Sequence, residues 1–164
     1  MIDNILELDA PVALSDYEIE RGKPMPDRNH AIIQGRLMSR LDRTYGDKFS
    51  ILPEIHIDMP VRDRVPDLAI YEPLIFDPDV NELSMFKPPL CAIEILSEMQ
   101  NINVLMKKKH EYFDVGVLSY WLVLPSLRTI YVFHNINDRS IFSYEDRLVD
   151  KKLNIELDLS DIFK

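Results

Sequence analysis

The apolar run Leu90-Cys91-Ala92-Ile93-Glu94-Ile95-Leu96 decides the fold, because it predicts a buried strand. Glu94 interrupts this run, and an unpaired carboxylate inside a buried strand is energetically costly. Glu94 is therefore expected to be paired, protonated or bound to a metal ion, and oxygen ligands completed by water suit Mg²⁺. A salt bridge to a nearby Arg or Lys, or an edge strand with one wet face, would explain the same residue without catalysis.

A second strand is expected upstream at residues 67–71, and a proline-rich loop separates it from the strand of Glu94. Asp67 begins this strand directly after Pro66, where its carboxylate can face the same cleft as Glu94. Two carboxylates on adjacent strands can hold a divalent ion that polarises a phosphodiester and lowers the pKa of an attacking water. A turn aspartate before a strand is the simpler alternative.

The other elements follow from the period of the apolar residues. Helical spacing predicts helices at residues 16–20, 29–45 and 101–115, which end at Gly22, Gly46 and Gly116. Alternation predicts further strands at residues 49–59, 119–124, 129–134 and 141–144. Ser15 is a plausible N-cap of the first helix, and Pro53 marks its strand as an edge or a bulge. The expected fold class is mixed α/β (α+β), a central mixed sheet flanked by helices, within a single domain over residues 1–164.

Composition limits the classes of function. The chain has 164 residues, of which 46% are hydrophobic and 29% charged, as in one globular domain. The single cysteine, Cys91, rules out an internal disulfide and fits a reducing, cytoplasmic location. We expect neither secretion nor membrane insertion, because Met1-Ile2-Asp3-Asn4 lacks the start of a signal peptide and no apolar run approaches the ~20 residues of a spanning helix. The net charge of −9 argues against coating nucleic acid through the overall field, but it does not exclude a local site.

An ordered set of motifs carries a family resemblance. The stretch Val65-Pro66-Asp67-Leu68-Ala69-Ile70 precedes Pro88-Pro89-Leu90-Cys91-Ala92-Ile93-Glu94-Ile95-Leu96-Ser97. Downstream come Lys108 and Tyr112 at Lys-x-x-x-Tyr spacing, then Gly116-Val117 and Tyr120-Trp121; Tyr17, Gly22, Met25 and His30 fit a looser upstream pattern. In order and separation these residues resemble the Uma group of restriction endonucleases, in the PD-(D/E)XK nuclease superfamily, over roughly residues 14–134. The ordered set carries the resemblance, since no single motif is specific.

The resemblance implies a restriction-endonuclease-like core that hydrolyses DNA phosphodiesters with Mg²⁺, or Mn²⁺ in its place. It implies Asp67 and Glu94 as metal ligands, the carbonyl of Ile95 as a third ligand, and Glu54 as an acid that completes the shell. The partner would be DNA, and a homodimer is left open. In the superfamily's usual motif a lysine lies two residues after the acid, where this sequence has Leu96. In the Uma group the lysine stands on the following helix, which points to Lys108 as the residue that orients or activates water.

The helix of residues 101–115 offers a second lysine for this role. Lys109 lies near the centre of its apolar face and can extend its ammonium to solvent, whereas Lys108 lies at the border and can reach into a cleft. The alternative is that Lys107, Lys108 and Lys109 form only a solvated basic patch.

Two departures from the family pattern keep other functions open. Val104 stands where the group often has an aspartate before the lysine, and Leu124 stands where an aspartate often follows the Tyr-Trp strand. A catalytically silent nuclease-fold domain, which binds DNA or acts as a scaffold, is therefore one alternative. An acidic protein-interaction module, consistent with the net charge, is the other.

Basic residues of the helix at residues 29–45 have two interpretations each. His30 can contact a phosphate or assist the site, although an isolated helical histidine is more often structural. Arg36, Arg40 and Arg43 recur at helical spacing and form a ridge that can contact nucleic acid or an acidic partner. Pairing of these arginines with Asp42 or Asp47 is the simpler explanation.

Overall fold

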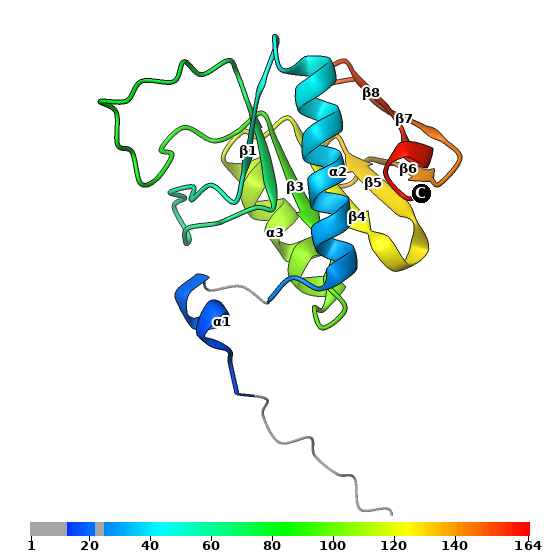
Figure 1. The fold of residues 1–164 in the computed structure, drawn as a ribbon, viewed down its shortest axis with the longest axis horizontal. Coiled ribbons are helices and arrows are strands. Elements are labelled where there is room, and N and C mark those ends of the chain that lie inside the picture. The colour runs from blue at the N-terminus through cyan, green and yellow to red at the C-terminus, as the bar shows by residue number, and fades with distance from the viewer. Residues whose placement is uncertain (1–12, 22–24) are drawn as a thin grey trace, which may run out of the picture.

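The computed structural model describes residues 13–21 and 25–164, in which a mixed six-stranded sheet carries a long helix on each face (Figure 1). The elements in chain order are α1 (Asp16–Arg21), α2 (Arg28–Tyr45), β1 (Ser50–Pro53), β2 (Leu68–Tyr71), β3 (Cys91–Ile95), α3 (Ile102–Asp114), β4 (Ser119–Leu124), η1 (Pro125–Leu127), β5 (Thr129–Phe133), β6 (Arg139–Ser143), β7 (Arg147–Asp150), β8 (Ile155–Asp158) and η2 (Leu159–Asp161). The predicted fold class is confirmed. The predicted helix end at Gly22 and the motif-bearing side chain of Tyr17 lie outside what the structure describes.

The three predicted helices are present, and local chemistry sets their ends. At α1 the hydroxyl of Ser15 accepts a bond from the amide of Glu18 at 3.3 Å, while the Ser15 amide donates to the Glu18 carboxylate at 2.8 Å, a reciprocal capping box. α2 ends at Gly46, whose φ of −63° is not left-handed; a Cβ there would clash with the carbonyl of Asp42. Gly116 follows α3 with a φ of +96°, which glycine adopts without strain.

The sheet has the order β1-β2-β3-β4-β5-β6. The pair β3 and β4 is parallel, as a crossover through α3 requires, and every other neighbouring pair is antiparallel. β3 and β4, which are buried along their whole length, lie at the centre of this sheet. The edge position predicted for the strand with Pro53 is confirmed, because β1 is an outer strand.

The predicted strand at residues 49–59 was too long. β1 ends at Pro53, and Glu54 has a φ of +48°, which turns the chain out of the strand. Beyond this turn Ile57 forms only isolated bridges, with Arg64 and Met85. Residues before the turn pack on the α2 side of the sheet, and those after it pack on the α3 side, so the alternation of apolar residues continues although the strand does not.

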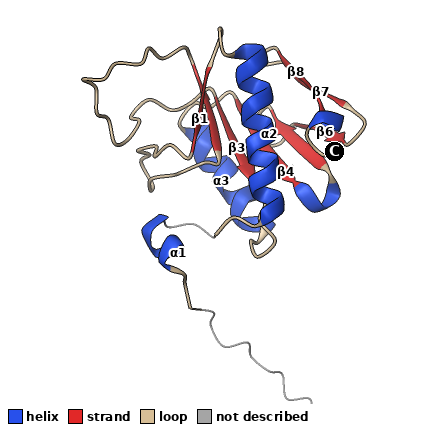
Figure 2. Cartoon of the chain, in the orientation of Figure 1, coloured by secondary structure: helices blue, strands red, loops and turns tan. Residues whose placement is uncertain are grey.

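A C-terminal hairpin of β7 and β8 completes the α2 side, and it was not predicted. Figure 2 shows this hairpin beside α2, apart from the main sheet. Its apolar side chains, among them Leu148, Ile155 and Leu157, join α2 and Trp121 in one buried cluster. The strands have four residues each, too few for a period to stand out from chance. Within the described residues, no helix is both long enough and apolar enough to cross a membrane.

A buried carboxylate fastens the hairpin to the sheet. Asp150, which is 0% exposed, accepts bonds from the hydroxyl of Ser119 at 3.0 Å and from the indole of Trp121 at 2.8 Å. It also accepts bonds from the amides of Lys152 and Leu153 in the hairpin turn. Each of these donors would lose its partner if the carboxylate were removed.

We therefore expect Asp150→Ala to lower the free energy of unfolding by about 3 kcal/mol, because buried donors are left unsatisfied. Urea unfolding monitored by tryptophan fluorescence measures the change. The matched control is Asp158→Ala in the same hairpin, whose exposed carboxylate pairs with Arg147 and should contribute little. Equal losses in the two variants would contradict the role given to Asp150.

Candidate active site

Three acidic residues lie at neighbouring positions of β1, β2 and β3. Pro53 pairs with Leu68, and Leu68 pairs with Ile93. Glu54 directly follows β1, Asp67 directly precedes β2, and Glu94 directly follows Ile93 in β3. Paired residues of antiparallel strands are close neighbours, so strand pairing places these acids in the same region of the sheet.

Asp67 is the most heavily contacted of the three. Its Oδ2 accepts a bond from the amide of Ile95 at 2.7 Å, and its Oδ1 lies 3.1 Å from Nε2 of His30. Its carbonyl accepts bonds from the amide of Glu54 at 3.2 Å and from the side chain of Gln34 at 3.1 Å. The Asp67 side chain is only 3% exposed, so α2, β1 and β3 together fix its position.

Glu94 receives two donors from one face of α3. Its Oε1 lies 3.1 Å from the ammonium of Lys108 and accepts a bond from the hydroxyl of Tyr112, also at 3.1 Å. Lys108 and Tyr112 are four residues apart, which places both on the same side of the helix. Burial, and then the charge of Glu94, raise the pKa of Tyr112 well above its ordinary value, so its phenol keeps the proton that it donates. Both residues of the Lys-x-x-x-Tyr motif therefore contact the same carboxylate, that of Glu94.

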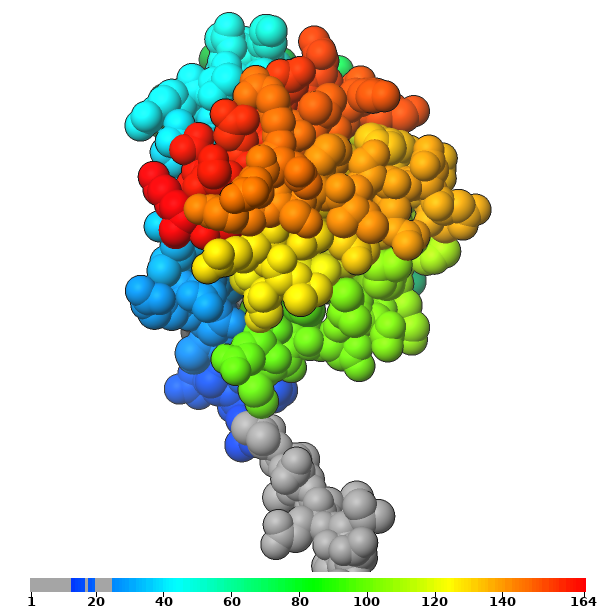
Figure 3. Space-filling model, turned by 90° about the vertical axis from the view of Figure 1, so that its right-hand side faces the viewer, coloured from blue at the N-terminus to red at the C-terminus, as the bar shows by residue number. Residues whose placement is uncertain are grey.

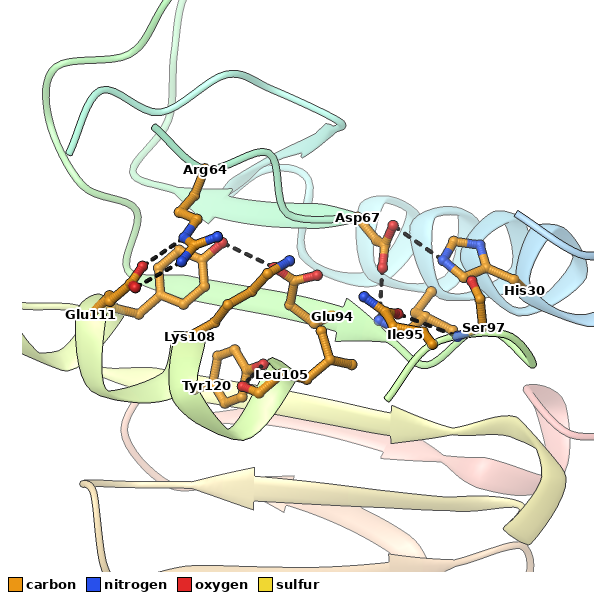
Figure 4. A network of polar contacts seen from close by, with 12 residues as sticks. His30, Arg64, Asp67, Glu94, Ile95, Ser97, Leu105, Lys108, Glu111 and Tyr120 are labelled. Atoms are coloured by element: carbon orange, nitrogen blue, oxygen red, sulfur yellow. Dashed lines mark hydrogen bonds and ion pairs between the residues drawn. The ribbon is translucent and has the colours of Figure 1, made fainter. Parts of the chain in front are cut away.

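Arg64 and Glu111 close the network beside Glu94, as Figure 4 shows. The guanidinium of Arg64 makes two bonds to Glu111, from Nε at 2.6 Å and from Nη2 at 2.7 Å. Hydrogen bonds from Arg64 hold the pKa of Glu111 below its usual value. Burial alone would lower the pKa of Arg64, but the hydrogen bonds and the charge of Glu111 outweigh it and raise this pKa. This pair joins the segment before β2 to α3.

Sequence reasoning gave no site position to Arg64 or Glu111, and it named Tyr112 only as part of the Lys-x-x-x-Tyr motif. One signal was available, because Lys108, Glu111 and Tyr112 have the spacing of one helix face. Nothing in the sequence pointed to Arg64, which reaches Glu111 across 47 positions.

Lys108 and Lys109 of α3 point to different surroundings. Lys109 donates to the carbonyl of Ile136 at 2.7 Å, and its ammonium lies 4.4 Å from the ring centre of Phe133. Burial, and then the charge of Arg139, lower the pKa of Lys109. Of the three lysines that the solvated-patch alternative grouped together, only Lys107 is exposed. That alternative is therefore wrong for Lys108 and Lys109.

The oxygen donors of Asp67 and Glu94 fit Mg²⁺. This ion commonly takes one or two carboxylates and keeps several waters, so a closed protein cage is not needed. In residues 13–21 and 25–164, no group of three or more His, Cys, Asp or Glu side chains could hold a metal ion. Glu54 therefore does not form a ready-made triad of carboxylates with the other two, and its role, like that of the Ile95 carbonyl, stays a prediction.

The remaining predicted positions fall in and around this network. His30 is buried and contacts Asp67, while its Nδ1 has no hydrogen-bond partner among the described residues. Val104 is 47% exposed on the first turn of α3. Leu124 is buried in the core on the α3 side, so it supplies packing where the family often has a carboxylate.

The arginine ridge of α2 is engaged with the C-terminal residues. Arg40 pairs with Asp161 at 3.2 Å, and Arg36 donates to the carbonyls of Ile162 and Lys164 at 3.0 and 2.6 Å. The pairing proposed from the sequence, with Asp42 or Asp47, is therefore wrong for these two arginines. Both acids lie at or beyond the end of α2, whereas Asp161 approaches from the η2 turn.

The ion pair of Lys108 and Glu94 should show energetic coupling. We expect Lys108→Met to lower the free energy of unfolding by about 2 kcal/mol, because buried Glu94 loses its cation, and Glu94→Gln to recover much of this loss in the double variant. Denaturant unfolding of the two single variants and the double variant measures the coupling. The matched control is Lys107→Met on the exposed side of the same turn. Strictly additive losses would show that the two side chains do not interact.

Comparisons with known proteins identify a family and a similar fold. Residues 5–162 match the model of the Uma2 family, described as "Putative restriction endonuclease". No curated protein matches the sequence. The crystal structure of a putative nuclease belonging to DUF820 from Anabaena variabilis ATCC 29413 superposes with a TM-score of 0.76 at 20% identity, over 86% of this chain and 83% of that chain.

A weaker likeness, with a TM-score of 0.44 and 14% identity, relates 77% of this chain to 11% of a chain in the cryoEM structure of the DrdV-DNA complex. The likeness to the DUF820 protein supports the fold, and the family match spans nearly the whole sequence. The protein belongs to the Uma2 family of putative restriction endonucleases.

Proposed function

We propose that the protein is a Mg²⁺-dependent endonuclease that hydrolyses phosphodiester bonds of DNA, with Mn²⁺ able to replace Mg²⁺. The observation that carries the proposal is the pair of buried carboxylates, Asp67 directly before β2 and Glu94 within the neighbouring strand β3, with Lys108 3.1 Å from Glu94. Membership of a restriction endonuclease family supports DNA as the substrate.

Different residues of the chain would hold the metal and orient its ligands. Asp67 and Glu94 would hold the metal, with the carbonyl of Ile95 and the side chain of Glu54 as further ligands. A bound Mg²⁺ supplies charge that polarises the scissile phosphate and lowers the pKa of the attacking water. His30 and the Ile95 amide keep the Asp67 carboxylate in one orientation, as Tyr112 does for Glu94.

Lys108 is the group that we expect to act on the water or on a phosphate oxygen. Its side chain is 12% exposed, against 4% for Glu94, so the ammonium lies on the outer side of the pair. An ammonium there can donate a hydrogen bond to an incoming oxygen while it stays close to the carboxylates.

One observation favours a second candidate, the catalytically silent domain. The charge of Glu94 is already balanced by Lys108, and Asp67 is already paired with His30, so both carboxylates have a structural explanation. The aspartates often found in the family at Val104 and Leu124 are replaced as well. Such a domain would bind DNA without cutting it.

Metal binding separates these candidates. We expect isothermal titration calorimetry to detect Mg²⁺ or Mn²⁺ binding that Asp67→Asn and Glu94→Gln each weaken by about tenfold or more, as loss of a direct ligand should exceed loss of a supporting contact. The matched control is Asp63→Asn, an exposed acid that contacts His56 rather than the site. Unchanged affinity in both site variants would remove the metal-binding role.

The lysine assignment makes a prediction about rate. We expect Lys108→Ala to slow metal-dependent cleavage about 10²-fold, a common cost of losing a group that acts in the transition state. Lys109→Ala should act mainly on stability, because its ammonium is bonded to Ile136 and its stem is buried. Cleavage of plasmid and single-stranded DNA, with thermal melts of both variants and of Lys107→Ala as control, tests this.

Two results would count against these assignments. If Lys109→Ala abolished cleavage without changing the melt while Lys108→Ala stayed active, the lysine assignment would be wrong. If the unmodified protein bound DNA but cut neither substrate with Mg²⁺ or Mn²⁺, the silent domain would be the better description.

A further inference from the structure

Three adjoining hollows follow the exposed side of α2. The largest of them, about 470 Å³, is lined by residues from Ala31 to Arg43 together with Asp161 and Lys164. The second shares Arg36 and Lys164 with it, and a third shares Arg28 with the second and reaches Leu96 after β3. In Figure 3, the early part of α2, the C-terminal residues and the segment near residue 125 meet on one face. We call these three adjoining hollows together the α2 groove.

Basic side chains dominate the α2 groove. Its charged lining consists of the basic residues Arg28, Arg36, Arg40, Arg43, Arg128 and Lys164 and the acidic residues Asp27, Glu98 and Asp161. On a chain with a net charge of −9, such a local excess of cations stands out. Arg36 and Arg40 hold the C-terminal residues. Within the described part of the chain, Arg28, Arg43 and Arg128 are exposed and form no ion pair with an acid.

Residues with small side chains form the floor of the groove along the helix. Ala31, Gly35 and Ser39 recur every four residues and line the largest hollow. Glycine weakens a helix relative to alanine, and a Cβ on Gly35 would meet nothing within 4 Å, so no internal packing explains this glycine. Glycine does serve where another backbone must approach closely.

One end of the groove includes residues of the first turn of α2, which also carries His30. His30, which contacts Asp67, lies on the first turn of α2, next to Arg28 and Asn29 in the groove wall. From Arg28 to Arg43 the helix rises about 22 Å, a length that corresponds to about six base pairs of duplex DNA. Guanidinium groups suit phosphate because they present paired donors in a planar fork.

We propose that the α2 groove binds the phosphate backbone of duplex DNA and leads it to the site of Asp67 and Glu94. The inference rests on the proposed endonuclease function, because that function supplies DNA as the partner. The positive excess, the small side chains of the floor and the position of one end on the helical turn that carries His30 favour a nucleic-acid backbone over an acidic protein segment.

The first test is fluorescence anisotropy with a labelled DNA duplex in metal-free buffer. We expect the triple variant Arg28→Gln, Arg43→Gln, Arg128→Gln to bind at least tenfold more weakly. The logarithm of the binding constant decreases linearly with the logarithm of the salt concentration. The magnitude of this slope should be smaller by about three in the triple variant, close to one for each lost phosphate contact. The control is Arg139→Gln, Lys151→Gln, Lys152→Gln, which removes the same charge from exposed residues outside the groove and should bind as the unmodified protein does.

The second test separates binding from folding. Gly35→Gln replaces glycine by a better helix former and should raise the melting temperature, yet its side chain fills the groove and should weaken DNA binding several-fold. Gly35→Ala should raise the melting temperature as well but leave the groove open and the affinity nearly unchanged. Tighter or equal DNA binding by Gly35→Gln would overturn the proposal.

The outcomes distinguish the groove from the nuclease activity. If the unmodified protein binds and cuts DNA while the arginine triple variant binds equally well, the groove proposal is overturned and the endonuclease stands. If binding depends on these arginines but no metal supports cleavage, the groove proposal holds and the endonuclease is overturned. If a polyglutamate peptide binds through the same arginines and the duplex does not, the groove belongs to an acidic protein and the proposal is overturned.

Discussion

The contacts of Asp67 fix the place where α2, β1, β2 and β3 meet. Its carboxylate bonds the Ile95 amide at the end of β3 and pairs with His30 on α2, while its carbonyl bonds the amide of Glu54 after β1. A buried carboxylate is tolerated only with such partners. Folding therefore requires the same arrangement that holds this acid in place, so the geometry of the site and the packing of α2 on the sheet cannot vary independently.

Much of the fold could be predicted because its longest elements carry strong local signals. α2 and α3 have apolar faces of several turns, and β3 and β4 are buried throughout, so helical period and apolar run length were sufficient. The β7–β8 hairpin could not be predicted, since its short strands are stabilised by Asp150 and by packing against α2 rather than by any local pattern. The strand that began at residue 49 was overextended because alternation does not reveal which face of the sheet each apolar residue reaches.

The residues of the candidate site differ in how far the sequence alone could point to them. A carboxylate inside an apolar strand identified Glu94, a motif and its order identified Asp67, and resemblance together with helix geometry separated Lys108 from Lys109. The bracing pair of Arg64 and Glu111 depends on a contact between distant segments, which spacing along one element cannot reveal. For the proposed metal, the sequence suggests oxygen donors but does not give the number of protein ligands, because Glu54 lies in a left-handed turn after β1.

The ion pair of Glu94 and Lys108 serves both folding and the proposed catalysis. In the resting protein, Lys108 compensates a carboxylate that is almost fully buried, and this alone justifies its position. The same position keeps an ammonium on the outer side of the acids, where an anionic substrate would arrive. A net charge of −9 repels DNA from most of the surface, so a local basic groove along α2 would also restrict the direction of approach. Acidity of the whole chain and affinity for a polyanion are therefore compatible, provided that the cations are concentrated in this groove rather than spread over the molecule.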